Sequence, residues 1–328
     1  MKAIHTKDLS KSYWFYEKEA GLSGSFKSLF RGKKVSIDAV QGINLDIGIG
    51  EIVGFIGPNG AGKTTTLKMF AGILHPSGGE VKVVGFIPHR REKDFLKHIT
   101  FVTGQRNRLF WDLPAEEYFE FCKIIYEIPG AEYRKNLKEL IELAGIGDIL
   151  RVPQRKLSAG ERKRCELVAA LLHDPKVIFL DEPTNALDLI SAGKIREFIR
   201  EKGKAGRHTI ILTSHNMADI EQVCERVVII NKGKIVCDEG IRELSRHNRF
   251  KKQIRIVFDG PWALSQVEGL GDIVRVDAQE VLLEVDRERA ASVASRLFSH
   301  YPVKDIGIMD QPLEKIIESF FRNGEAVG

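Results

Sequence analysis

The sequence contains few cysteines and no long hydrophobic run. Its four cysteines stand apart without a C-x-x-C pair. The spacing therefore indicates neither a zinc site nor a redox motif, and scattered thiols fit a reducing compartment. No run approaches the roughly 18 apolar residues of a membrane span, and residues 1–10 lack the apolar stretch of a secretory signal. We therefore expect a protein that acts outside the bilayer.

Neither sign of charge dominates the chain. It carries 50 basic and 45 acidic residues, a net charge of +5, which is too small an excess to require a nucleic-acid partner. The hydrophobic share of 43% and the charged share of 29% are ordinary for a globular protein. At roughly 150 residues per domain, a chain of 328 residues predicts two domains.

Apolar strands alternate with helical patterns up to about residue 245. The expected strands cover 43–56 (two, around a turn at 48–50), 177–180, 209–213, 227–231 and 234–237. The expected helices cover 63–73, 114–126, 132–144, 161–172, 189–202 and 216–224. This alternation predicts a parallel sheet covered on both faces. The apolar stripe of the second helix is assigned to the core, and its members are Tyr118, Phe119, Phe121, Cys122, Ile125 and Tyr126.

Two further segments differ from this alternation. Residues 14–36 interleave aromatic and basic side chains, which fits either an amphipathic segment against a membrane protein or lipid or a surface loop with a small core. After a polar linker near 246–252 the chain predicts strands and helices of a small α+β domain at 253–328, with no motif that indicates its role. The strands are expected at 253–258, 273–277 and 281–285, and the helices at 287–298 and 312–321.

The strongest motif follows the apolar run at 52–56 and matches G-x-x-x-x-G-K-[ST] in full. Glycines allow backbone N–H groups to approach phosphates, and the following helix adds its positive N-terminus. We expect Lys63 to neutralise the β- and γ-phosphates and Thr64 to ligate Mg²⁺. The expected nucleotide contacts are Gly57, Pro58, Asn59, Gly60, Ala61, Gly62, Lys63, Thr64 and Thr65.

A second motif is the apolar run 177–180, which ends in Asp181 and Glu182. A strand without alternation is expected to lie inside the sheet, so the two carboxylates stand at its end. Asp181 suits Mg²⁺ binding, and Glu182 is placed to deprotonate an attacking water. Two acids at a strand end are common, but together with the phosphate loop they indicate a hydrolase.

A third motif, Leu157-Ser158-Ala159-Gly160-Glu161, opens the helix at 161–172. By itself it predicts an ordinary capping box, with Ser158 as the cap and Glu161 three residues on. Its position ahead of Asp181 gives it a second interpretation.

The order of these motifs, together with Gln105, residues 185–188 and His215, resembles the ATP-binding cassette (ABC) ATPases over about residues 1–245. The resemblance implies an α/β fold: a P-loop NTPase (RecA-like) core with antiparallel β and helical subdomains, the latter at about 105–172. It also implies ATP and Mg²⁺ as cofactors. The small C-terminal α+β domain would be an accessory domain.

The family resemblance implies that two cassettes pack head to tail as a homodimer, or with a paired ATPase subunit, and trap two ATP molecules. Ser158 and Gly160 of one copy would face the nucleotide held by the other, and the segment ending at Asp188 would cross the interface. Glu161, where the family commonly has glutamine, puts a negative charge near that phosphate.

The resemblance also assigns three single residues. Gln105 would sense Mg²⁺ and the attacking water, His215 would contact the γ-phosphate, and Tyr13 would stack on adenine. Taken alone, Gln105 also fits a surface residue, His215 a helix cap and Tyr13 a core residue.

The pairing of a cassette with a small C-terminal domain is similar to bacterial drug, antibiotic and viologen exporter ATPases. It implies integral membrane permease subunits as partners, a peripheral location at the cytoplasmic face of the membrane, and no nucleic acid. Leu109, Phe110 and Trp111 are assigned to the groove that receives the permease. The alternatives are a soluble ABC protein acting on ribosomes or nucleic acid and a P-loop kinase; a single cassette without heptads disfavours the first and the Ser158 motif the second.

Overall fold

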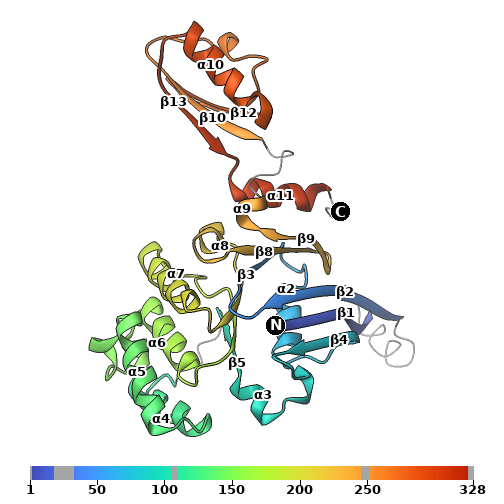
Figure 1. Ribbon diagram of the computed structural model, residues 1–328, viewed down its shortest axis with the longest axis vertical. Helices are drawn as coiled ribbons and strands as arrows, with labels where there is room; N and C mark the ends of the chain where they lie inside the picture. The colour runs from blue at the N-terminus through green and yellow to red at the C-terminus, as the bar shows by residue number, and fades with distance from the viewer. Residues whose placement is uncertain (1, 18–32, 105–109, 245–250, 324–328) are drawn as a thin grey trace, which may run out of the picture. The chain divides into compact units, whose positions relative to one another are not determined.

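The computed structural model describes residues 2–17, 33–104, 110–244 and 251–323 (Figure 1). The chain divides into two compact units, Met1–Asp238 and Glu239–Gly324. The division falls inside a strand, ahead of the polar linker near 246–252 that the composition suggested as the boundary. Within the described residues no helix combines the length and the apolar character needed to cross a membrane.

A six-stranded sheet with the order β5-β6-β7-β3-β8-β9 forms the centre of the first unit. Its strands are β3 (Ile52–Ile56), β5 (Ile99–Thr103), β6 (Val177–Asp181), β7 (Thr209–Thr213), β8 (Arg226–Asn231) and β9 (Lys234–Gly240). The first five strands in that order pair in parallel. Strands β3 and β7 are buried along their whole length, as strands covered on both faces are. The predicted parallel sheet is confirmed, although β5 had not been expected.

A three-stranded antiparallel sheet with the order β2-β1-β4 lies beside it (Figure 1). Its strands are β1 (Lys2–Glu17), β2 (Lys33–Gly48) and β4 (Gly78–Val83). Both ends of the predicted surface segment at 14–36 therefore belong to strands, and residues 18–32 lie outside the described residues. The pairing of Trp14 with Ser36 and of Phe15 with Val35 continues the ladder, because aromatic and β-branched side chains suit a strand.

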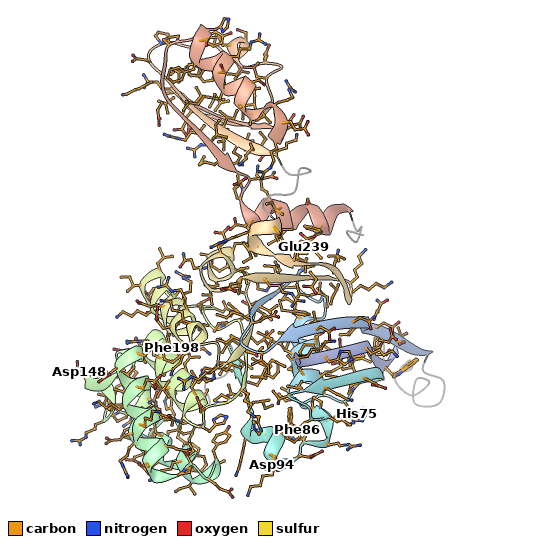
Figure 2. All side chains as sticks on the ribbon, in the orientation of Figure 1. His75, Phe86, Asp94, Asp148, Phe198 and Glu239 are labelled. Atoms are coloured by element: carbon orange, nitrogen blue, oxygen red, sulfur yellow. The ribbon has the colours of Figure 1, made fainter. Side chains whose placement is uncertain are left out.

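Seven α-helices are described in the first unit. They are α2 (Lys63–Phe70), α3 (Lys93–Lys97), α4 (Ala115–Ile125), α5 (Gly130–Ala144), α6 (Ala159–Leu171), α7 (Leu189–Lys204) and α8 (Met217–Val223). Helices α4, α5 and α6 gather on one side, away from the antiparallel sheet (Figure 1). Phe198 of α7 is buried (Figure 2). Helix α2 ends three residues before the predicted end, because Gly72 takes a left-handed φ of 67° with the carbonyl of Pro88 against it.

The apolar stripe of α4 corrects one prediction. Phe119 and Cys122 are buried as expected, but Phe121 is 42% exposed and Ile125 is 55% exposed. Helix α4 packs on α6 and leaves Phe121, Ile124 and Ile125 exposed. All four cysteines are free and buried.

The second unit contains an antiparallel sheet with the order β11-β12-β10-β13. Its elements are α9 (Ile241–Leu244), β10 (Lys252–Phe258), β11 (Asp272–Val276), β12 (Glu280–Val285), α10 (Ala290–His300), β13 (Val303–Asp310) and α11 (Leu313–Asn323). Side chains of α10, such as Leu297, share a buried cluster with Ile254, Ile256 and Leu283 of the sheet. Strand β13 had not been expected. A glycine and three charged residues interrupt its alternation of apolar and polar side chains, so that only the pairing with β10 identifies it as a strand.

Candidate active site

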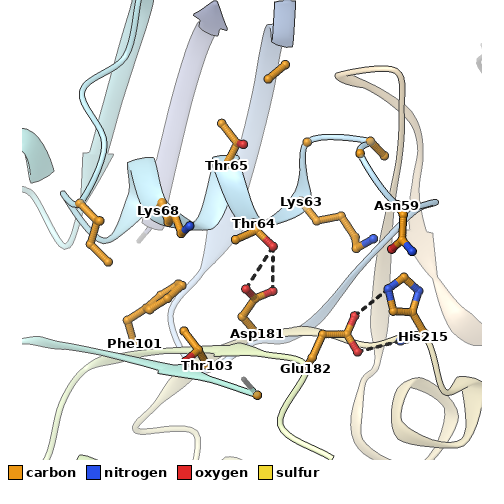
Figure 3. A pocket seen from close by; sticks show the side chains of 16 residues that line it. Asn59, Lys63, Thr64, Thr65, Lys68, Phe101, Thr103, Asp181, Glu182 and His215 are labelled. Carbon is orange, nitrogen blue, oxygen red and sulfur yellow. Dashed lines mark hydrogen bonds and ion pairs between the residues drawn. The ribbon is translucent and has the colours of Figure 1, made fainter. Parts of the chain in front are cut away.

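A cavity of about 870 Å³ opens where the parallel strands of the first unit end (Figure 3). The carboxyl ends of the strands are the usual place for a ligand in an open α/β sheet. The cavity is lined by Ala39, Asn59, Gly60, Ala61, Gly62, Lys63, Thr64, Thr65, Lys68, Ile73, Phe101, Thr103, Gly104, Asp181, Glu182 and His215. The structure thus brings together the phosphate-loop motif, the acidic pair and His215, which the sequence placed far apart.

The glycine-rich loop is shaped by close backbone approaches. A Cβ on Gly57 would lie 2.2 Å from the carbonyl oxygen of Ile230, and one on Gly62 would lie 2.4 Å from that of Ala39. Gly62 also has a φ of 107°, which only glycine adopts easily. The loop is therefore held between β2 and β8, with its backbone turned toward the cavity.

Lys63, the first residue of α2, is buried under this loop. Its Nζ donates hydrogen bonds to the carbonyl oxygens of Gly57 at 2.6 Å and of Pro58 at 3.1 Å. Burial lowers the pKa of the ammonium group, and the carboxylates of Glu182 and Asp181 oppose that shift. The two hydrogen bonds hold the side chain at the wall of the cavity.

Thr64 and Asp181 face each other across the cavity (Figure 3). The Thr64 hydroxyl lies 3.2 Å and 3.1 Å from the two carboxylate oxygens of Asp181. A second hydroxyl, that of Thr213 at the end of β7, donates to the same carboxylate at 2.7 Å. Sequence reasoning missed Thr213; its position at the end of a neighbouring parallel strand was the available signal.

Glu182 and His215 form a pair at the strand ends (Figure 3). The His215 Nε2 lies 3.1 Å from one carboxylate oxygen, and the His215 backbone N–H donates to the other at 3.3 Å. Burial raises the pKa of the Glu182 carboxyl, against the opposing effect of His215. Glu182 also has a φ of 57°, a costly backbone conformation that is often found at functional sites.

Gly104 follows β5 and packs directly on the acidic pair. Its N–H donates to the Asp181 carbonyl oxygen at 2.6 Å. A Cβ at this position would lie 2.2 Å from the Glu182 carbonyl oxygen, so no larger residue fits. Gln105, the next residue, lies outside the described residues, and its assigned role stays a prediction.

The Ser158 motif forms the capping box that its spacing predicts. The Ser158 hydroxyl accepts from the Glu161 N–H at 3.3 Å, and the Glu161 carboxylate accepts from both the N–H and the hydroxyl of Ser158 at 2.8 Å. Gly160 packs on α7, where a Cβ would meet the Ser191 hydroxyl at 2.3 Å. The hydrogen bonds from the N–H and the hydroxyl of Ser158 lower the pKa of the Glu161 carboxyl.

Asp188 caps α7 by accepting from the backbone N–H groups of Ile190 at 3.0 Å and Ser191 at 2.9 Å. The lining of the cavity in this copy does not include Asp188, Ser158 or Gly160. Tyr13 on β1 is exposed, with Lys11 Nζ 5.4 Å from its ring centre, and is also absent from the lining.

A family model described as ABC transporter matches residues 40–185, and a second, described as EvrA-like ABC transporter, C-terminal domain, matches residues 250–309. The ABC transporter ATP-binding protein NatA of Bacillus subtilis (strain 168) is 32% identical over 67% of this chain and 89% of NatA. The chain belongs to the ABC transporter family of ATP-binding proteins. ATP hydrolysis is the activity of these cassettes, so this member is a P-loop ATPase.

Other members of the ABC family agree with this assignment. The bacitracin transport ATP-binding protein BcrA of Bacillus licheniformis is 32% identical over 75% of this chain and 72% of BcrA. A dimeric structure of the ATP-binding cassette MJ0796 bound to ADP and Pi has a TM-score of 0.58 at 25% identity, covering 73% of this chain and 99% of that one. The expected P-loop NTPase fold is confirmed.

Proposed function

We propose that this chain is the ATP-binding subunit of an ABC exporter and drives separate permease subunits from the cytoplasmic face of the membrane. The observation that carries the proposal is one cavity in which Lys63, the Thr64–Asp181 pair and the Glu182–His215 pair converge. A relative named for bacitracin transport supports a role in antibiotic or drug export.

ATP is the substrate, and the roles follow from the geometry of the cavity. Lys63 and the loop N–H groups would bind the phosphates, with the N-terminus of α2 behind them. Glu182 would accept the proton of the attacking water, and its raised pKa brings it nearer to neutral pH, where a general base works best. His215 would orient the carboxylate and contact the terminal phosphate.

Tyr13 would stack on the adenine ring at the edge of the cavity. It pairs across the ladder with Ile37 of β2, on the strand that also supplies Ala39 to the lining. Both Tyr13 and Ile37 are exposed, so an apolar base could cover them.

Mg²⁺ fits the oxygens that this chain offers. The Thr64 hydroxyl and the Asp181 carboxylate lie about 3 Å apart in the same cavity, and Mg²⁺ prefers oxygen ligands, commonly one or two carboxylates plus substrate phosphates. Bound there, the ion would neutralise phosphate charge. Thr213 would hold Asp181 in place.

A second copy would complete the site. Ser158, Gly160 and Asp188 stand at the N-termini of α6 and α7 and do not line their own cavity. In a head-to-tail dimer these helix ends would meet the phosphates of the partner's ATP. To make that contact, the Ser158 hydroxyl would leave the Glu161 carboxylate, which accepts it in the single copy.

The dimer requirement predicts that the turnover rate per subunit rises with protein concentration. Ser158→Arg is expected to remove this rise and most of the turnover, while the affinity for ATP stays close to wild type because Ser158 lies outside its own cavity. Phosphate release measured across a concentration series checks the prediction. Ser295→Arg on an exposed position of α10 is the matched control, and equal behaviour of the two variants would contradict the dimer.

An exposed aromatic surface beside α4 fits a permease contact. Phe110 is 46% exposed and packs edge-on against Tyr118 and Phe121, with ring centres 5.5 Å away. Trp111 is 54% exposed and lies 5.2 Å from the Arg162 guanidinium of α6. A helix of the permease seated here would therefore touch the helix that begins at Ser158. Leu109 lies outside the described residues.

Trp111→Ala is expected to weaken assembly with the permease and to abolish the stimulation of ATP turnover by it. The physical reason is the loss of a large exposed ring, the kind of residue that anchors interfaces. Co-purification of the membrane subunits and the turnover rate in the complex check it. Phe298→Ala removes a ring from α10 that is 62% exposed, slightly more than Trp111, and is the control. Unchanged assembly in Trp111→Ala would contradict the assignment of Trp111 to the permease-binding groove.

A further inference from the structure

One buried carboxylate, Asp219 of α8, joins three segments around the proposed site. Its side chain is 1% exposed. One oxygen accepts from the Ser214 hydroxyl at 2.6 Å and from the Thr184 hydroxyl, and the other accepts from the Arg196 guanidinium at 2.9 Å. Arg196 supplies the opposite charge, so the buried ion is fully compensated.

The donors of this cluster flank the two proposed catalytic residues. Thr184 stands two residues after Glu182, and Ser214 stands immediately before His215. A single carboxylate therefore fastens the loop that follows β6 to the loop that follows β7. The cluster itself is absent from the lining of the cavity, so it acts through the backbone rather than on the substrate.

The loop that follows β6 has a strained backbone that its surroundings must hold in place. Glu182 has a φ of 57° and Ala186 a φ of 60°, and such left-handed conformations persist only where the surroundings hold them. Thr184 lies midway between the two and is the residue that Asp219 holds. Glu182 is bound independently through its N–H, which donates to the carbonyl oxygen of Thr213 at 3.1 Å.

We propose that Asp219 is a positioning residue that sets the spacing between Glu182 and His215. This inference rests on the proposed roles of those two residues. Their side chains are 3.1 Å apart, and a displacement of about 1 Å in such a pair costs on the order of 100-fold in rate. Loss of the Asp219 charge leaves two hydroxyls and a guanidinium competing for one weaker acceptor.

The decisive variants remove the bonds without changing shape. Thr184→Val deletes the hydroxyl and is expected to lower kcat about 10- to 100-fold with little change in KM, whereas Thr184→Ser keeps the donor and restores kcat. Asp219→Asn is expected to lower kcat similarly and to retain ATP binding. ATP titration, steady-state phosphate release and thermal unfolding of the full chain provide the readouts.

A matched control separates positioning from stability. Lys202, half of an ion pair with Glu139 at 2.5 Å, is also buried but lies away from the cavity. Glu139→Gln should lower the unfolding temperature without lowering kcat. Wild-type kcat in both Thr184→Val and Asp219→Asn, or equal losses in Glu139→Gln, would overturn the proposal. Glu182→Gln assayed in parallel distinguishes this outcome from failure of the proposed function, in which that variant would turn over normally.

Discussion

Glu182→Gln is expected to make ATP turnover very slow while ATP remains bound. The substitution keeps the shape and the acceptor oxygen but removes the basic site that lies beside His215 at 3.1 Å. General-base catalysis contributes about 100- to 10,000-fold to a rate, so kcat should fall by that order. Lys63 and the loop are untouched, so the variant should accumulate as an ATP-bound dimer, which phosphate release and size-exclusion chromatography in ATP would detect.

The pH dependence of the wild type gives an independent test of Glu182. A base must be deprotonated to act, and burial raises the pKa of this carboxyl above the ordinary range of glutamate. The turnover rate should therefore rise with pH through that raised pKa and be lost at lower pH. Glu225→Gln, at an exposed acid just after α8, is the control, and wild-type turnover in Glu182→Gln would remove Glu182 from the role of base.

Lys63→Ala is expected to weaken nucleotide binding itself. The Nζ donates to the carbonyl oxygens of Gly57 and Pro58, within the loop that is expected to hold the phosphates. A hydrogen bond to a charged group contributes about 1.5–3 kcal/mol, which corresponds to a loss of about 10- to 100-fold in ATP affinity. Fluorescent-ATP titration and isothermal calorimetry measure it directly.

The Lys63→Ala and Glu182→Gln variants should differ in kind. Lys63→Ala changes affinity, whereas Glu182→Gln changes only the rate, because one residue holds the phosphates and the other acts on water. Lys82→Ala removes an exposed lysine of β4 that lies outside the cavity and is the control for net charge. An unaltered affinity for ATP in Lys63→Ala would contradict the placement of the phosphates at this loop.

The parts of the fold that the sequence predicted are those with local signals. Uniformly apolar runs such as 177–180 and 209–213 identified β6 and β7 within one residue, because a strand covered on both faces needs no polar alternation. Strand β13 was missed, since its charged residues take their places only by pairing with β10. The aromatic residues of α4 were wrongly assigned wholly to the core, because periodicity marks an apolar face but does not say what covers it.

The residues of the site also divide into those with a local sequence signal, which were predicted, and those without one, which were not. Lys63, Thr64, Asp181 and Glu182 were found through short motifs and His215 through the family resemblance, and the structure places all five around one cavity. Asp219 was not found, because its partners lie 35, 23 and 5 residues away in the sequence, with no motif to join them. The roles assigned to Tyr13, Ser158, Gly160, Asp188 and Gln105 stay predictions, since they depend on the nucleotide, on a second copy or on residues outside the described ones.

The contact at Gly104 has a mechanical consequence. Its N–H holds the Asp181 carbonyl, and its bare Cα rests on the carbonyl of Glu182. A force applied to the chain just beyond this residue therefore reaches the backbone of both acids through a single peptide unit. Tension from outside the cassette would therefore reach the proposed base and the proposed metal ligand together.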